Sequence, residues 1–113
     1  MADTIFGKIL RGEVPSKRLH EDERCIVIAD IHPQAPFHAL VIPRKAIPSL
    51  ADAQRDDEAL LGHCLLVAHQ VAKAGGVGDA FRVVTNSGAG AGQTVPHLHF
   101  HVLGGRPLRG GMG

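Results

Sequence analysis

Apolar residues recur at helical spacing near the start of the chain. The members of this short stripe are Ile5, Phe6, Ile9 and Leu10. Their intervals of three and four residues predict a short helix over residues 5–11. Asp3 or Thr4 can cap its first turn, and Gly12 can end it.

A second apolar stripe is longer and wider. Its members are Leu60, Leu61, Cys64, Leu65, Val67, Ala68, Val71 and Ala72. Residues 56–58 are acidic and favour the positive end of a helix dipole, while Gly75 and Gly76 end the pattern. We therefore predict one long helix between these two signals. A stripe this wide indicates either burial within one subunit or contact with a second subunit.

Short apolar segments fill much of the remaining chain and predict strands. They are residues 17–21, 25–30, 38–43, 81–85 and 97–103. A chain of 113 residues has room for one domain, spanning 1–113. The pattern predicts an α+β fold: one five-stranded antiparallel sheet with one long and one short helix, both helices covering the same face.

Composition narrows the possible partners. The chain has 12 basic and 11 acidic residues, which are interspersed, and a formal net charge of +1. No basic stripe is present, so we expect no nucleic-acid partner. No apolar run approaches the roughly 20 residues that span a bilayer, and the N-terminus has no signal-peptide pattern. We therefore expect a cytoplasmic protein without membrane contact. Cys25 and Cys64 are the only cysteines, and both are predicted to be buried free thiols.

The segment His-Leu-His-Phe-His carries the strongest chemical signal. Side chains alternate between the faces of a strand, so His97, His99 and His101 are predicted to share one face. The other face would carry Leu98, Phe100 and Val102 and pack into the core. A solvated face rich in histidine is the plain alternative, but such faces are usually built from Thr, Lys or Glu.

Two kinds of chemistry compete for these histidines. A metal ion could bind two of them, but the Cα atoms of His97 and His101 are about 13 Å apart on a strand. No Asp, Glu or Cys adjoins the motif to complete a metal site. A neutral imidazole can instead attack phosphorus near pH 7 without a separate base. This alternative favours His99 as the nucleophile, with no metal or cofactor.

A glycine-rich loop over residues 88–94 comes directly before the histidines. Glycines allow backbone N–H groups to turn toward an anion, so the loop could hold a phosphate. Gln93 could add an amide, and Thr94 a hydroxyl. Taken alone, the loop is more typical of a flexible hairpin connection, and its place directly before the histidines favours a functional role.

Other polar residues have less specific signals. Asp30 could accept hydrogen bonds from a ribose diol beside an apolar base pocket bordered by Ile28 and Ile31, or it could simply begin the turn at His32-Pro33. His38 could be a buried histidine or could orient another side chain. We expect the other histidines, His20, His63 and His69, to be surface or structural residues.

Three stretches of the chain resemble the histidine-triad (HIT) family, and specifically its Hint branch of purine nucleoside phosphoramidases. They are residues 3–9, residues 30–43 and residues 92–106, the last ending in Leu-Gly-Gly-Arg. The resemblance implies a HIT-like fold and a homodimer in which two sheets join into a larger one, with the long helix near the interface. It also implies hydrolysis of the P–N bond of adenosine or guanosine 5′-phosphoramidates to a nucleoside monophosphate and an amine. A purine nucleotide-binding or partner-binding protein without catalysis is the alternative.

The resemblance also implies roles for individual residues. His99 would form a nucleotidyl-histidine intermediate, His101 and Thr94 would assist the leaving group, and His97 and His38 would position the site. The substrate would contact Asp30 at the ribose, Asn86, Gly92, Gln93 and Thr94 at the phosphate, and Ile5, Phe6, Ile9, Ile28, Ile31 and Leu40 at the base.

Several positions depart from the commoner family pattern. Thr94 stands where Ser is usual, His32 where Ser is frequent, Pro96 where Tyr is frequent, and Ala46 where some relatives carry another His. The tail after Arg106 lacks the aromatic residue that some relatives place beside the partner's site. These changes bear on leaving-group preference more than on the reaction.

Overall fold

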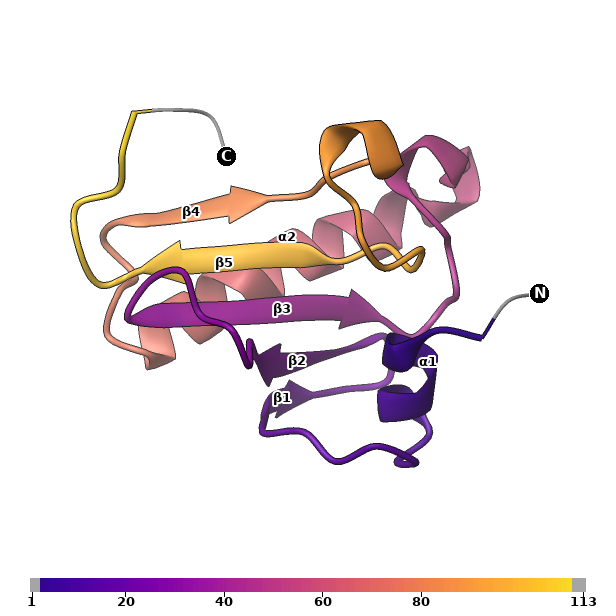
Figure 1. Ribbon diagram of the computed structural model, residues 1–113, viewed down its shortest axis with the longest axis horizontal. Coiled ribbons are helices and arrows are strands. Elements are labelled where there is room, and N and C mark those ends of the chain that lie inside the picture. The colour runs from indigo at the N-terminus through magenta and orange to yellow at the C-terminus, as the bar shows by residue number, and fades with distance from the viewer. Residues whose placement is uncertain (1–2, 111–113) are drawn as a thin grey trace.

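Five antiparallel strands form one sheet in the order β1-β2-β3-β5-β4 (Figure 1). The computed structural model describes residues 3–110, so the last three residues of the tail lie outside it. The strands are β1 (Arg18–Glu21), β2 (Cys25–Ala29), β3 (Phe37–Pro43), β4 (Phe81–Val84) and β5 (Phe100–Gly104). The predicted α+β fold with a five-stranded antiparallel sheet is confirmed.

Two α-helices accompany the sheet, α1 (Ile5–Leu10) and α2 (Glu58–Ala74). Thr4 caps α1, because its hydroxyl accepts a hydrogen bond from the Gly7 backbone N–H at 3.0 Å. Gly12 follows α1 with a φ of +77°, a conformation that favours glycine. Short 3₁₀ turns occur at Leu50–Asp52, Arg55–Asp57 and Ala89–Ala91. Both predicted helices are confirmed to within a few residues.

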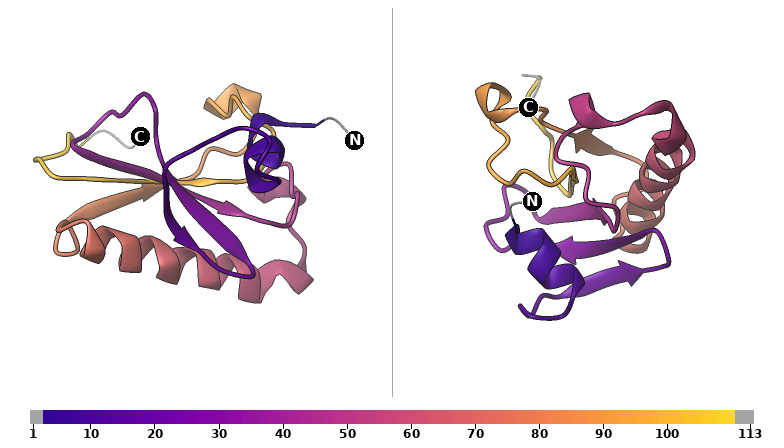
Figure 2. Two further views of the ribbon diagram at one scale, coloured as in Figure 1. Left: turned by 90° about the horizontal axis from the view of Figure 1, so that it is seen from below. Right: turned by 90° about the vertical axis from the view of Figure 1, so that its right-hand side faces the viewer.

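The two helices lie on opposite faces of the sheet (Figure 2). Val27 and Val41 pack against α2, whereas Ile26 and Ile42, their neighbours along the strands, pack against α1. All four side chains are fully buried. The prediction that both helices cover one face is therefore wrong. Strands β2 and β3 are apolar on both faces because each face has its own core.

Strand β5 begins at Phe100, later than the predicted start at His97. The preceding residues leave the sheet because their backbone groups bind elsewhere. The Leu98 N–H donates to the carbonyl of Ile47 at 2.7 Å, and the His97 N–H donates to the carbonyl of Val95 at 2.8 Å. These bonds tie the segment to the loop after β3 and hold His97 in a bend.

The helix α2 is buried on one side only. Cys64, Val67 and Val71 belong to the core, but Leu65 and Leu66 are 51% and 66% exposed. Cys25 and Cys64 are both buried free thiols, as predicted. Among the described residues, no helix has the length and apolar character needed to cross a membrane.

Candidate active site

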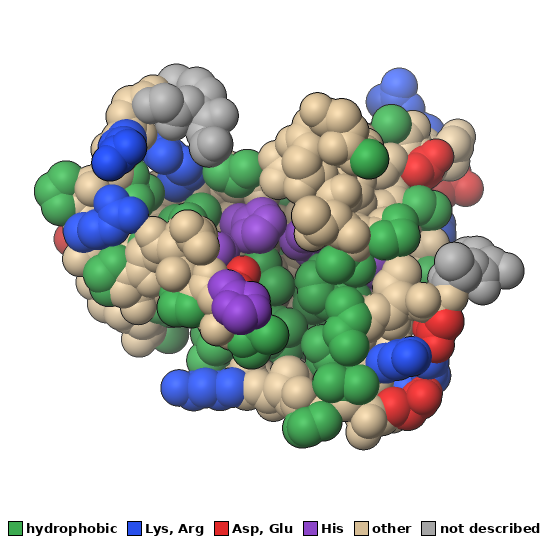
Figure 3. Space-filling model, in the orientation of Figure 1, with side chains coloured by type: hydrophobic (Ala, Val, Ile, Leu, Met, Phe, Trp, Pro, Cys, Tyr) green, Lys and Arg blue, Asp and Glu red, His purple; other side chains and the backbone are tan. Residues whose placement is uncertain are grey.

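The histidines of the motif lie on the α1 face of the sheet. The ring centroid of Phe6 in α1 is 4.8 Å from that of His99 and 6.2 Å from that of His97, both in edge-on contact. Leu98, Phe100 and Val102 belong to the core under α2. Figure 3 shows histidine side chains gathered in a hollow at the centre of this face, beside apolar side chains. The predicted division between a core face and a histidine face is confirmed.

A backbone carbonyl determines which nitrogen of His99 carries its proton. The Nδ1 atom of His99 lies 2.7 Å from the carbonyl oxygen of His97. A carbonyl only accepts hydrogen bonds, so Nδ1 must be the protonated nitrogen and donate. The Nε2 atom of the neutral ring then keeps a free lone pair. The hydroxyl of Thr85 donates to the carbonyl of His99 at 2.8 Å and fixes the backbone of this residue.

His97 is oriented in a similar way. Its Nε2 atom donates to the carbonyl oxygen of Pro43, the last residue of β3, at 2.8 Å. The ring is almost fully buried. His97 therefore links the segment before β5 to the end of β3 and supports the residues that follow it.

His38 and His101 form a short chain of hydrogen bonds. The backbone N–H of Gln34 donates to Nδ1 of His38 at 3.0 Å, so His38 carries its proton on Nε2. That Nε2 lies 3.0 Å from Nδ1 of His101 and donates to it. The remaining proton of a neutral His101 is therefore on its Nε2. The ring centroids of His99 and His101 are 5.1 Å apart.

Burial keeps these imidazoles neutral. Loss of contact with water lowers the pKa of His38, His97 and His99 below the ordinary histidine value. Burial also lowers the pKa of His101 to about 4, and the neighbouring His99 and His38 add to this effect. At pH 7 all four rings are therefore uncharged, and His99 can act as a nucleophile without first losing a proton.

Asp30 lies next to this chain of histidines. One carboxylate oxygen accepts a hydrogen bond from the His32 N–H at 2.8 Å, which is the turn-forming role. The other oxygen is 3.3 Å from Nε2 of His38. The expectation that no carboxylate adjoins the histidine motif is therefore wrong. Asp30, His38 and His101 have ligand atoms within 4.8 Å of one another. The Gln34 N–H, however, occupies Nδ1 of His38, so the proton on Nε2 cannot move there and free the lone pair that a metal would need.

The glycine-rich loop is held by the side chain of Gln93. Its amide oxygen accepts from the Gly88 N–H at 2.8 Å, and its NH₂ group donates to the carbonyls of Pro48 and Val95 at 2.7 and 2.9 Å. The backbone N–H groups of Gly92 and Gln93 also donate to carbonyls within the loop. The structure thus places Gln93 in loop stabilisation, while Thr94 beside it is exposed and Asn86 is partly buried.

The six residues expected at the base differ in exposure. Phe6, Ile9, Ile28 and Leu40 form part of the core beneath α1. Ile5 and Ile31 are 44% and 85% exposed. The first four can therefore build the wall of a binding site, and the last two present free apolar surface.

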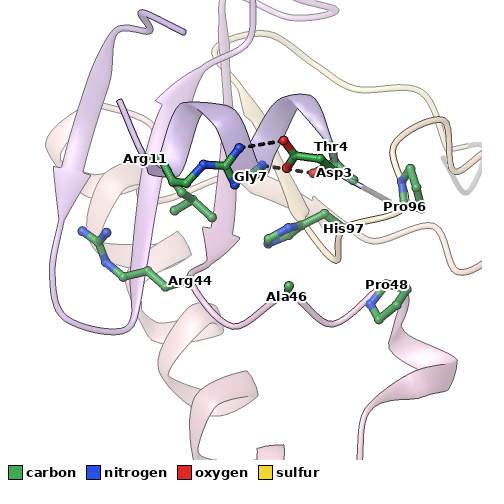
Figure 4. Close-up of a pocket in the computed structure, with 10 residues that line it drawn as sticks. Asp3, Thr4, Gly7, Arg11, Arg44, Ala46, Pro48, Pro96 and His97 are labelled. Carbon is green, nitrogen blue, oxygen red and sulfur yellow. Dashed lines mark hydrogen bonds and ion pairs between the residues drawn. The ribbon is translucent and has the colours of Figure 1, made fainter. Parts of the chain in front are cut away.

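A separate pocket of about 550 Å³ lies beside α1. Figure 4 shows His97 pointing toward it, with Ala46 and Pro48 on one side and Arg11 bound to Asp3 on the other. His99 and His101 do not line this pocket. We assign the chemistry to the histidine hollow, because the reactive nitrogens are there. Ala46 and Pro96, two of the departures from the family pattern, both line the pocket.

Two supporting residues were not identified from the sequence. Thr85 and Gln34 each act on the site through one hydrogen bond. Gln34 lies within the family-like stretch 30–43, but its residue type alone assigned it no role. Thr85 lies just after β4, in an apolar segment that gives no sign of a polar role. Only the pairing of β4 with β5 brings it to His99.

Comparisons with known proteins agree with this geometry. The HIT domain family matches residues 11–108. An uncharacterized HIT-like protein of Synechocystis is 55% identical over 106 residues, covering 94% of this chain and 93% of the relative. A HIT family hydrolase from Legionella pneumophila has a TM-score of 0.92 at 41% identity, covering 94% of this chain and 96% of that one. A histidine triad protein from Clostridium difficile has a TM-score of 0.92 at 39% identity, covering 99% and 98%.

Proposed function

The chain belongs to the HIT domain family, and on this basis we propose that it hydrolyses purine nucleoside 5′-phosphoramidates. The products would be a nucleoside monophosphate and an amine. The observation that supports this most strongly is the hydrogen bond from His99 Nδ1 to the His97 carbonyl at 2.7 Å. It leaves the lone pair of Nε2 free in a ring that is neutral at pH 7, which is the requirement for attack on phosphorus.

The first half of the reaction forms a bond between His99 Nε2 and the α-phosphorus and breaks the P–N bond. The leaving nitrogen needs a proton, and His101 is the donor that we propose. A bound phosphate raises the pKa of His101, because an opposite charge favours the protonated ring. Asp30, 3.3 Å from His38 Nε2, can then accept the hydrogen bond that His38 gives to His101 in the free protein.

The second half restores the enzyme. Water attacks the phosphorus, the bond to His99 Nε2 breaks, and the now neutral His101 takes the proton of the water. His97 and His38 hold the reacting rings in place through the carbonyl of Pro43 and the N–H of Gln34. None of these steps uses a metal, so we expect activity to survive a strong chelator.

The remaining site residues would bind the nucleotide. Ile5 and Ile31 would contact the purine over a wall formed by Phe6, Ile9, Ile28 and Leu40, and Asp30 would bind the ribose hydroxyls. The phosphate side would be formed by Asn86, Gly92, Gln93 and Thr94. Because Gln93 and the Gly92 N–H already have partners within the loop, we assign the direct phosphate contact on this side to the Thr94 hydroxyl.

We also propose that two chains form a dimer through β4 and α2. Strand β4 is an edge strand with one neighbour, so it can pair with a second copy and extend the sheet. Leu65 and Leu66 expose apolar surface on α2, and His69, one turn further, stacks on Phe81 of β4. The exposed leucines and the open edge therefore lie next to each other.

Two free thiols also suit a reducing compartment, and we place the reaction in the cytoplasm.

A fluorogenic phosphoramidate tests the proposed reaction directly. Purified protein should release the amine from an adenosine or guanosine 5′-phosphoramidate, with and without chelator, and hydrolyse an alkyl phosphate ester of the same nucleoside more slowly. Binding of the monophosphate without release of amine would favour a nucleotide-binding protein instead. Activity that disappears with the chelator and returns with metal would favour a metal-dependent hydrolase.

A further inference from the structure

A second group of reactive side chains lies on the α2 face of the sheet. His20 in β1 pairs with Val27, whose side chain belongs to the core under α2. Asp22 and Cys25 follow in the turn and at the start of β2, and His63 projects from α2 to the same place. We call His20, Asp22, Cys25 and His63 the Asp22 cluster. The histidines of the active site lie on the opposite face.

The carboxylate of Asp22 is the centre of this cluster. One oxygen accepts hydrogen bonds from the backbone N–H groups of Arg24 and Cys25, at 2.7 and 2.9 Å, which fixes its orientation. The other oxygen is 2.6 Å from His20 Nε2 and 2.8 Å from His63 Nε2. The thiol sulfur of Cys25 is 3.7 Å from the same oxygen. Three ligand atoms, from His20, Asp22 and Cys25, therefore lie within 4.8 Å of one another, and His63 Nε2 reaches the same carboxylate oxygen from α2.

We propose that the Asp22 cluster is a zinc site. Zinc is bound by imidazole nitrogen, thiolate sulfur and carboxylate oxygen, most often four atoms in a tetrahedron. One carboxylate and one thiolate balance the charge of Zn²⁺, and the two histidines bind as neutral rings. On binding, the Cys25 sulfur forms a bond to zinc and its proton passes to solvent. The Nε2 protons that His20 and His63 give to Asp22 move through solvent to Nδ1 of each ring, which frees the Nε2 lone pairs for the metal. The sequence alone does not indicate this site, because His63 lies 41 residues from Asp22.

Three of the four ligand atoms already lie close together, and His63 must move nearer to His20 and Cys25 to complete the set. Zinc bonds of about 2.0 to 2.3 Å place neighbouring ligand atoms about 3.3 to 3.6 Å apart. The ligand atoms of His20, Asp22 and Cys25 already lie within 4.8 Å of one another. The two hydrogen-bonded nitrogens, now 2.6 and 2.8 Å from the carboxylate oxygen, must move about 0.5 to 1 Å away from it. The side chains of His20, Asp22 and His63 are 26–29% exposed, so they can adjust and an ion can reach them.

A metal here would join two parts of the fold. It would bind the turn between β1 and β2 to the second turn of α2, beside the fully buried Cys25 and Cys64. The reaction site is on the other face and shares none of these residues. We therefore expect zinc to stabilise the fold and to leave amine release unchanged. This inference does not depend on the proposed function.

Cobalt titration tests the site with an optical signal. Untagged, chelator-treated and reduced protein should bind one Co²⁺ per chain, with the visible bands of a tetrahedral ion and the near-ultraviolet band of a cobalt–thiolate bond. Zinc should abolish both signals. His63→Gln and Asp22→Asn should each weaken binding about 100-fold or more, and Cys25→Ala should remove the thiolate band.

Two control variants identify where the metal binds. His69→Gln removes another histidine of α2, and His101→Gln removes the group formed by Asp30, His38 and His101. Both should bind cobalt as the wild type does. The proposal is overturned if the wild type shows no thiolate band, if His63→Gln and Asp22→Asn bind normally, or if His101→Gln abolishes the signal.

Thermal unfolding provides a readout that does not need the buried thiol to be replaced. At about 100 times its dissociation constant, zinc should raise the Tm of the wild type by roughly 10 °C. His20→Gln and Asp22→Asn change partly exposed residues, and both should abolish most of this increase. An equal increase in these variants would contradict the proposal even if Cys25→Ala does not fold.

Discussion

The two faces of the sheet use histidine in different ways. On the α1 face, the rings of His97 and His99 donate to backbone carbonyls, and His38 donates to His101. On the α2 face, His20 and His63 both bind the carboxylate of Asp22. The first arrangement leaves a free lone pair on a neutral ring, and the second gathers ligand atoms around a negative charge.

Their electrostatics differ accordingly. Burial lowers the pKa of each histidine on the α1 face, so that these rings resist protonation. Burial tends to raise the pKa of Asp22, but hydrogen bonds from His20, His63 and two backbone N–H groups together hold the pKa well below its usual range. The comparison shows that the hydrogen-bond partner of an imidazole determines which of its nitrogens keeps a lone pair and which charge lies beside it.

Replacing the proposed nucleophile should give the largest difference in activity between substitutions on the two faces of the sheet. His99→Ala should lower kcat for a phosphoramidate by about 10⁴-fold or more, since no other group can form the covalent intermediate. Binding of the nucleoside monophosphate, measured by calorimetry, should weaken far less. His69→Ala, which changes an exposed histidine of α2, is the matched control and should retain full activity. A comparable loss of kcat in both variants would contradict the assignment of catalysis to the α1 face.

Core substitutions should affect activity on one face only. Phe6→Ala should destabilise the fold by about 3 kcal/mol, as expected for a buried phenylalanine. It should also lower kcat, because the ring contacts His99 at 4.8 Å between centroids. Val67→Ala, in the core under α2, should cost about 2 kcal/mol without a change in kcat. Urea unfolding and steady-state kinetics on both variants check this, and an equal loss of kcat would contradict it.

The free energy of unfolding should decrease as the pH is lowered, because the buried His101 on the α1 face resists protonation. The pKa of His101 is about 4 in the folded chain and about 6.5 in the unfolded chain, so the unfolded state binds a proton first. The contribution of His101 to stability should therefore be complete above pH 7 and decrease as the pH falls from 6.5 toward 4. The part due to His101 should be about 1 to 2 kcal/mol between pH 7 and 5, and His101→Gln should remove it. A wild-type urea midpoint that stays constant over this interval would show that the ring is not held neutral.

The smallest effect is expected from Asp22→Asn in metal-free protein. The amide keeps an oxygen for the Arg24 and Cys25 N–H groups but loses the charge that binds two imidazoles. Because the cluster is partly exposed to water, the cost should be about 1 kcal/mol. The kcat should not change, and a large decrease would mean that the faces are coupled.

Much of the fold could be predicted from periodicity. The stripes at Ile5–Leu10 and along α2 give both helices, and the apolar segments give all five strands. Periodicity could not place α1, because strands buried on both faces carry no polar side to mark its position. The apolar–polar alternation also predicted that β5 begins at His97. The alternation does continue there, but the backbone N–H groups of Leu98 and His97 bind the carbonyls of Ile47 and Val95 instead of a neighbouring strand.

The site was predictable where its residues lie close together in sequence. His97, His99 and His101 form a local pattern, so their common face followed from the geometry of an extended chain. Thr85, Gln34 and the carboxylate of Asp30 reach them only through tertiary structure. The Asp22 cluster was missed for the same reason, because His63 is 41 residues from Asp22.

The covalent intermediate is the central claim, and it can be measured directly. Protein mixed briefly with a nucleoside 5′-phosphoramidate and then quenched should gain the mass of one nucleotidyl group, and fragmentation should place that group on His99. The account predicts this adduct in the wild type and its absence in His99→Ala. An adduct on another histidine, or rapid release of amine in a single turnover without any adduct, would contradict it.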